Sequence, residues 1–227
     1  MRDYKQIETY EEAVSLINDI GILPIFPLIP NYPSLHSLTL DEHWFSRSEF
    51  DPWLWRVRFP NDGSAAYGKF IKKKATLISK ELFPLVKAIA GSPLTVEKRY
   101  KEGALAKTTA DLYPFIVAEE GIETQALKSQ SGMKAKEMKS SFDQALLSLQ
   151  GSMDIVISGA AVRRNKLGEE TKGWNSTSFE TAEHWMDSVG IENYTMKKEN
   201  AKKELLAHLV EICSPEAMAF FKKYYNL

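Results

Sequence analysis

Residues 108 to 182 carry a series of patterns whose order restricts the fold more than any other feature of the chain. Apolar residues recur first at helical spacing and later in alternation, which separates three helical segments from strand segments. In chain order they are a helix at 108–118 capped by Thr108–Asp111, a strand at 122–124, helices at 125–130 and 134–149, and strands at 153–159 and 177–182. This order is typical of a winged helix-turn-helix. We therefore expect an α+β, mainly helical fold containing that module.

The third helix of the series, 134–149, has an apolar stripe on one side and polar residues on the other. In a winged helix this third helix faces the major groove, and the hairpin tip contacts phosphates. Basic residues occur at both places, which predicts DNA binding. The fold also serves in protein docking, and Glu137 and Asp143 leave that alternative open. The basic residues are Lys134, Lys136 and Lys139 on the helix and Arg163, Arg164 and Lys166 on the hairpin.

The N-terminal part of the chain is organised differently. Thr9 and Glu12 form a capping box for a helix at 10–20, which Gly21 ends. The next forty residues hold six of the ten prolines and predict a structured loop with short strands or turns. After them we expect a strand at 65–71, a basic turn and a helix at 81–89.

Six aromatic residues lie within sixteen positions of this proline-rich stretch, so they must be buried or stack on a ligand. They are Trp44, Phe45, Phe50, Trp53, Trp55 and Phe59. Because aromatic rings beside cations hold unstacked bases, Trp53, Trp55, Arg56, Tyr67 and Lys69 form a candidate nucleic-acid site.

Asp51 precedes the tryptophans and is the candidate catalytic residue. A carboxylate among aromatic rings either has a raised pKa or pairs with a cation, here Arg56 or Arg58. We favour the ion pair, which would give Asp51 a structural role.

The net charge of −1 conceals a basic stretch at 67–107, which has ten basic and three acidic side chains. Lys72, Lys73 and Lys74 are its densest part. Such a stretch attracts a polyanion over a Debye length of about 8 to 10 Å. A solvated lysine face is the equal alternative.

Other functional classes find no support in the chain. It has no glycine-rich phosphate loop, its four histidines lack metal-ligand spacing, and Cys213 is the single cysteine. The longest apolar run, 20–29, is too short to span a bilayer, and the first residues do not resemble a signal peptide. We therefore expect a cytoplasmic protein with no metal and no cofactor.

The C-terminal residues predict two helices, at 199–212 and from Pro215 onward, that pack on the core or form a homodimer. The expected division is an N-terminal aromatic and basic region at 1–103, the winged helix at 104–186, and C-terminal helices at 187–227.

Three motifs resemble one known family. They are Asp51-Pro52-Trp53-Leu54-Trp55-Arg56, Ala66-Tyr67-Gly68-Lys69-Phe70, and Ile155-Val156-Ile157-Ser158-Gly159 followed by Gly173-Trp174. The stretch from Ile7 to about Trp185 resembles the AlkZ-related proteins of Gram-positive bacteria, distant relatives of the AlkZ, or YcaQ-like, DNA glycosylases.

The resemblance implies winged-helix modules, DNA binding, a role in DNA repair or genome maintenance, and no metal or bound cofactor. The Gln-x-Gln or Gln-x-Asp motif of the glycosylases is missing here. Base excision is therefore a secondary expectation, and a non-catalytic transcriptional regulator or a protein-interaction module is the alternative.

Overall fold

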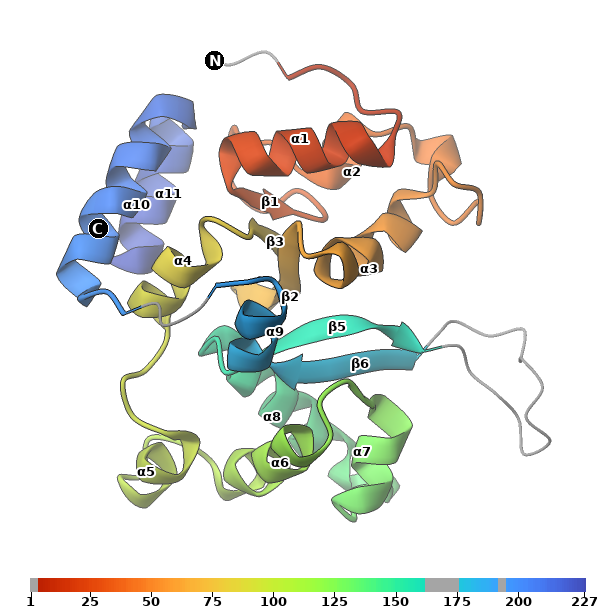
Figure 1. The fold of residues 1–227 in the computed structure, drawn as a ribbon, viewed down its shortest axis with the longest axis vertical. Coiled ribbons are helices and arrows are strands. Elements are labelled where there is room, and N and C mark those ends of the chain that lie inside the picture. Colours follow the sequence, from red (N-terminus) through yellow and green to blue (C-terminus); the bar gives the residue numbers. More distant parts are fainter. Residues whose placement is uncertain (1–3, 162–175, 192–194) are drawn as a thin grey trace.

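Two three-stranded antiparallel sheets, each packed against helices, form the centre of the α+β structure. The computed structural model describes residues 4–161, 176–191 and 195–227. Figure 1 shows the sheets in the middle of the molecule, with α1, α2, α10 and α11 at one end and α5 to α7 at the other. No helix among these residues has the length and apolar character to cross a membrane.

The first sheet follows the predicted N-terminal helix. α1 (Tyr10–Ile20) begins at the Thr9 capping box, and Gly21, at φ 75°, turns the chain directly into β1 (Ile22–Pro24). The sheet order is β1-β3-β2, with β2 at Ala65–Ile71 and β3 at Lys74–Ser79. The helix and strand β2 confirm the expectation, whereas β3 was missed. β3 was missed because the turn before it is only two residues long. Lys72 and Lys73 both adopt the left-handed conformation, at φ 47° and 59°, which is typical of a tight two-residue hairpin loop.

The proline-rich stretch is only partly irregular. It contains α2 (Leu35–Leu38), a 3-10 turn η1 (Asp41–His43), and the unpredicted helix α3 (Pro52–Asp62). The expectation of turns without a helix was wrong at α3, because proline is well tolerated in the first turn of a helix, where its missing N–H costs no hydrogen bond. Pro52 occupies that turn, directly after the N-cap residue Asp51.

The second sheet follows the predicted order of elements. After α4 (Phe83–Ala90) and α5 (Val96–Lys101) come the elements that we expected, namely α6 (Lys107–Ala118), β4 (Ile122–Glu123), α7 (Thr124–Gln130), α8 (Lys139–Gly151), β5 (Ile155–Ala161) and β6 (Ser176–Thr181). Its strand order is β4-β6-β5. A 3-10 turn, η2 (Lys136–Met138), which the sequence did not predict, precedes α8.

Two helix starts in this part differ from the prediction. α6 begins at Lys107 with Ala106 as N-cap, so the residues expected to cap it lie inside its first turns. α8 begins at Lys139 after the 3-10 turn, and Lys134 and Lys136 therefore precede the helix.

The C-terminal helices return to the first sheet. α9 (Ala182–Ser188) follows β6, α10 (Lys198–Ile212) packs along α4, and α11 (Pro215–Tyr225) reaches the β2–β3 hairpin. There the Tyr224 hydroxyl donates to the carbonyl of Phe70 at 3.0 Å and accepts from the N–H of Lys72 at 3.2 Å.

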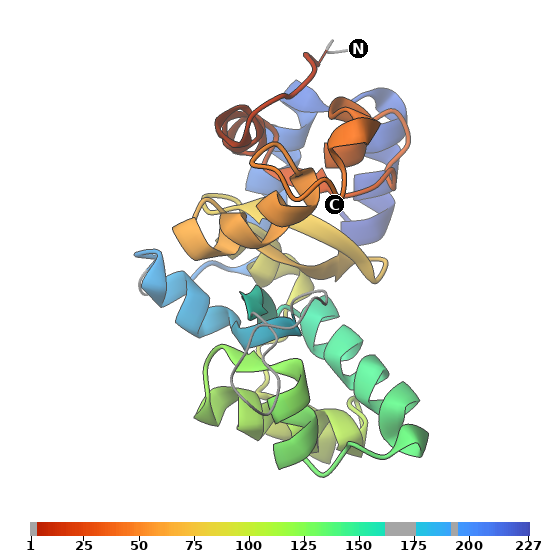
Figure 2. The ribbon, with the colours of Figure 1, turned by 90° about the vertical axis from the view of Figure 1, so that its right-hand side faces the viewer.

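Trp185 of α9 joins the two sheets. Its ring is 1% exposed and packs edge-on against Phe83 with ring centres 5.0 Å apart, while Nε1 donates to the carbonyl of Pro60 on α3 at 3.1 Å. A second link runs from the N–H of Lys69 on β2 to Oε1 of Gln150 on α8, at 2.9 Å. Figure 2 shows α9 and the β5–β6 hairpin at the level where the two halves meet.

Replacing Trp185 with Phe is expected to lower the free energy of unfolding by about 2 kcal/mol, because ring volume and a buried hydrogen bond are lost. Urea denaturation followed by circular dichroism measures this. Phe50→Leu, at a side chain that is 42% exposed, serves as the control and should change stability by less than about 0.5 kcal/mol. A Trp185→Phe protein that unfolds at the wild-type urea concentration would show that this contact does not hold the halves together.

Candidate nucleic-acid interface

Asp51 is the N-cap of α3, and its carboxylate is fully buried. It accepts three backbone hydrogen bonds, from the N–H groups of Phe45 at 3.0 Å, Arg47 at 2.9 Å and Trp53 at 2.9 Å. The expected ion pair with Arg56 or Arg58 was wrong, because the backbone groups of the preceding loop supply the hydrogen bonds instead. The carboxylate therefore closes a loop onto a helix and has no path to a substrate in this structure.

The aromatic cluster around Asp51 belongs mainly to the core. Trp55 is 3% exposed and donates from Nε1 to the carbonyl of Glu49 at 2.7 Å, and Tyr67 is 6% exposed, with its pKa raised by burial. Trp53 is half-buried, and the guanidinium of Arg56 lies 3.8 Å above its ring. Burial also lowers the pKa of Arg56. The rings of Trp55 and Tyr67 are thus unavailable for stacking on a base.

The basic residues are exposed, in contrast to the aromatic ones. Lysines of the β2–β3 hairpin and of the segment before α8 lie at the surface, and Lys73 at the hairpin turn donates from Nζ to Oε1 of Gln144 on α8 at 3.2 Å. This contact brings the basic turn beside α8. Lys72 instead lies over the ring of Phe220, with Nζ 4.6 Å from its centre. The exposed lysines are Lys69, Lys72, Lys73, Lys74, Lys134, Lys136 and Lys139, whereas Arg163, Arg164 and Lys166 lie outside the described residues.

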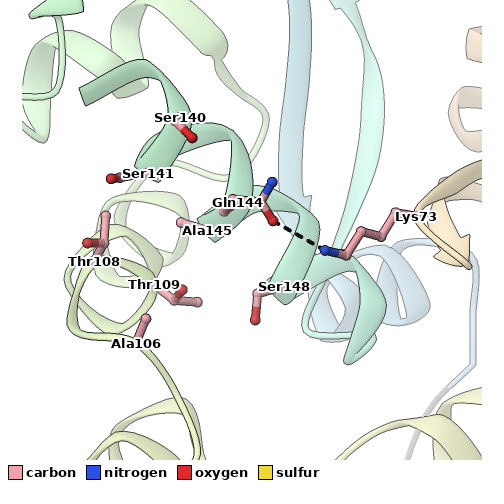
Figure 3. Close-up of a pocket in the computed structure, with 9 residues that line it drawn as sticks. All are labelled: Lys73, Ala106, Thr108, Thr109, Ser140, Ser141, Gln144, Ala145 and Ser148. Carbon is pink, nitrogen blue, oxygen red and sulfur yellow. Dashed lines mark hydrogen bonds between the residues drawn. The ribbon is translucent and has the colours of Figure 1, made fainter. Parts of the chain in front are cut away.

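A pocket of about 480 Å³ opens where the hairpin turn meets α6 and α8. Figure 3 shows side chains of both helices around it, with Lys73 at one end. In the part of the chain that the structure describes, the polar lining consists mainly of hydroxyl groups with one amide and one ammonium group, and it includes no carboxylate. The lining residues are Lys73, Ala106, Thr108, Thr109, Ser140, Ser141, Gln144, Ala145 and Ser148.

Sequence analysis missed most of this pocket. Ser140, Gln144 and Ser148 recur at every fourth position of α8, which places them on one helix face. That pattern was visible as the polar side of the amphipathic helix. No sequence pattern indicates that Thr108 and Thr109 of α6 line a pocket. The sequence predicts a helix cap at these residues, and their position opposite α8 depends on tertiary packing.

One group of described residues brings potential metal ligands together. Ligand atoms of Glu120, Glu180 and His184 all lie within 4.8 Å of one another. Each is already engaged: Glu120 accepts from the N–H and Oγ1 of Thr181 at 2.6 and 2.8 Å, and Nδ1 of His184 lies 2.5 Å from Oε2 of Glu180. We assign these side chains to fastening α9 onto β6.

The His184 contact makes stability depend on pH. Its hydrogen bond with Glu180 raises the pKa of His184 above the ordinary 6.5, whereas burial raises the pKa of Glu180. The folded protein therefore holds the imidazole proton more tightly than the unfolded chain. The stabilisation is complete below pH 6.5 and is lost as the pH rises through the pKa of folded His184.

Wild type is accordingly expected to exceed His184→Gln in free energy of unfolding by a few tenths of a kcal/mol at pH 6, because the exposed imidazole is screened by solvent. The difference should shrink toward pH 8.5. Urea unfolding at the two pH values measures it, with His43→Gln as the matched control. A difference that stays constant with pH would contradict the assignment.

Asp51→Ala is expected to lower the free energy of unfolding by about 2 kcal/mol, since a helix cap is removed and buried N–H groups lose their acceptor. Asp41→Ala, at an exposed carboxylate, should change it little. Chemical denaturation compares the two variants. If Asp51→Ala kept wild-type stability and lost a measurable enzymatic activity, a catalytic role would replace the structural one.

Comparison with known proteins places the whole fold in one family. The AlkZ-related family model matches residues 7–226, which include both sheets and the C-terminal helices. No curated protein and no solved structure gives a significant match to the chain.

Proposed function

The chain belongs to the AlkZ-related family, and on this premise we propose that it is a DNA-binding protein related to DNA glycosylases, with a role in DNA repair or genome maintenance. The match supports the AlkZ-related part of the resemblance found in the sequence and reaches beyond Trp185 to residue 226. The observation that carries the proposal is the contact of Lys73 with Gln144, which unites the basic hairpin turn and α8 in one surface.

We propose that the elements from α6 to β6 form a winged helix, with α8 as the helix nearest to DNA. Two observations support this: the chain order of helices and strands, and the sheet order β4-β6-β5, which places the short first strand beside the last one. Lys139 begins α8, and the chain between β5 and β6 carries Arg163, Arg164 and Lys166. In a winged helix both places contact the DNA backbone.

The end of α8 is closed to DNA. There Gln150 is buried and its Oε1 accepts from the N–H of Lys69 on β2. The exposed start of the helix, with Lys139, Ser140 and Asp143, remains open. The protein is therefore expected to hold DNA chiefly through backbone phosphates rather than through a long row of base contacts.

The proposed activity is binding rather than base excision by the aromatic cluster. Asp51, Trp55 and Tyr67 are buried, and the Gln-x-Gln or Gln-x-Asp motif is missing from the sequence. A base removed at this cluster would require its rings to leave the core.

Fluorescence polarisation of labelled duplex DNA at several salt concentrations tests the proposal. Lys139→Glu and Lys74→Glu are each expected to weaken binding about tenfold and to reduce the slope of log affinity against log salt by about 1, because each removes a phosphate contact. Lys203→Glu, at an exposed lysine of α10, is the charge-matched control and should bind like wild type.

Three results would change the conclusion. No binding at low salt would remove DNA as the partner and favour a protein-docking module. Equal binding by all three lysine variants would place the interface elsewhere. Release of an alkylated base from a modified duplex in the same samples would show an enzyme whose catalytic group lies outside the aromatic cluster.

A further inference from the structure

We propose that the pocket between α6 and α8 holds one phosphodiester group of the bound DNA, through the N-terminal N–H groups of α6, the Thr109 hydroxyl and the Lys73 ammonium group. The proposal rests on the proposed function, because DNA supplies the phosphodiester. The pocket would then be an anion-binding site, in a part of the chain where the sequence has no phosphate-binding motif.

The lining of the pocket favours an anion. Lys73 supplies a positive charge, and hydroxyl and amide groups supply further donors, while no carboxylate of the described residues lines the pocket to repel a phosphate. The nearest acidic residue of the first turns of α6, Asp111, is paired with Lys107, whose Nζ lies 2.5 Å from its Oδ2. The ammonium group of Lys73 has three N–H donors. One donates to Gln144, and the others can donate to a ligand.

The start of α6 adds partial positive charge. The helix has 12 residues, and its N-cap is Ala106, which offers no side-chain acceptor to the first N–H groups. Ala106, Thr108 and Thr109 of this end all line the pocket. The N–H of Thr109 already donates to the carbonyl of Ala106 at 3.0 Å, so the N–H groups of Lys107 and Thr108 are the ones that can face a ligand. Such N–H groups and the helix dipole bind phosphate.

The Thr109 side chain is the second observation that points to a ligand. The residue is only 3% exposed and lines the pocket, and its hydroxyl makes no hydrogen bond with another described residue. Its Oγ1 is not among the fully buried polar atoms without a partner, so this hydroxyl is open to the pocket. A helical threonine commonly donates to the carbonyl four residues earlier, and Thr109 does not. In Figure 3 its side chain extends from α6 toward the space in front of α8. A phosphate oxygen at that place would accept its proton.

The residues that line the pocket favour binding of the sugar-phosphate backbone of DNA over binding of its bases. Among the described residues no aromatic side chain lines it, so a base would find no ring there on which to stack. The volume of about 480 Å³ accommodates a phosphodiester with part of its sugars. The site would thus position DNA without reading its sequence.

The test uses two variants of the full-length protein in the duplex titration. Thr109→Val keeps the side-chain shape and removes the hydroxyl; we expect about tenfold weaker binding with an unchanged salt slope, since no charge is lost. Ala106→Asp places a carboxylate at the end of α6. It is expected to raise the melting temperature by capping the helix and to weaken binding at least tenfold by occupying the anion seat.

The opposite directions of these effects separate binding from folding. Thr195→Val, at an exposed threonine, and Ala207→Asp, at an exposed position of α10, are the matched controls and should bind like wild type. If Thr109→Val and Ala106→Asp both bound DNA like wild type while Lys139→Glu weakened binding, the pocket proposal would fail and the DNA-binding function would stand.

A wild-type protein that binds no DNA would overturn both proposals. Titration with inorganic phosphate, followed by the amide NMR signals of residues 106–109, then decides the source of the anion. Shifts of these signals without DNA binding would assign the pocket to a free phosphate compound, and unchanged signals would leave it with no anion at all.

Discussion

The buried Trp185 is one interaction that holds the two halves of the molecule together, beside the direct packing of β2 and α3 on β5. Each sheet has only three strands, and each needs helices to cover its apolar faces. The indole ring fills the space beside Phe83, and its N–H satisfies the carbonyl of Pro60, so a single side chain joins α9 to both α3 and α4. The pocket also needs both halves, because Lys73 comes from the first sheet and the other lining residues come from α6 and α8.

The polar side chains discussed above fall into two groups, those with hydrogen-bond partners within the protein and those without. The Asp51 carboxylate accepts from three N–H groups, Glu120 accepts from Thr181, and Glu180 bonds to His184. These contacts hold loops and helices in place. Thr109 differs from them, since its hydroxyl lies in a pocket without a partner among the described residues. Local satisfaction is therefore a better guide to role here than residue type.

Local signals predicted most of the longer helices and the strands β2, β4, β5 and β6. The capping box at Thr9, the apolar stripe of α8 and Ser214 before Pro215 depend on neighbours within a few residues, and all three appear in the structure. The predictions failed where the same residue type is compatible with two local structures. Pro52 begins a helix although prolines suggested loops, and the tight turn at Lys72 and Lys73 turned one predicted strand into a hairpin.

The sequence by itself determined the order of elements, the amphipathic faces, the basic stretch and the family resemblance, because these properties belong to residues close together in the chain. Only the tertiary structure decided which of the candidate side chains are accessible to a ligand. The burial of Asp51, Trp55 and Tyr67 and the meeting of Lys73 with α8 join residues far apart in sequence. Such contacts depend on how helices and sheets pack against one another, which periodicity and capping signals do not encode.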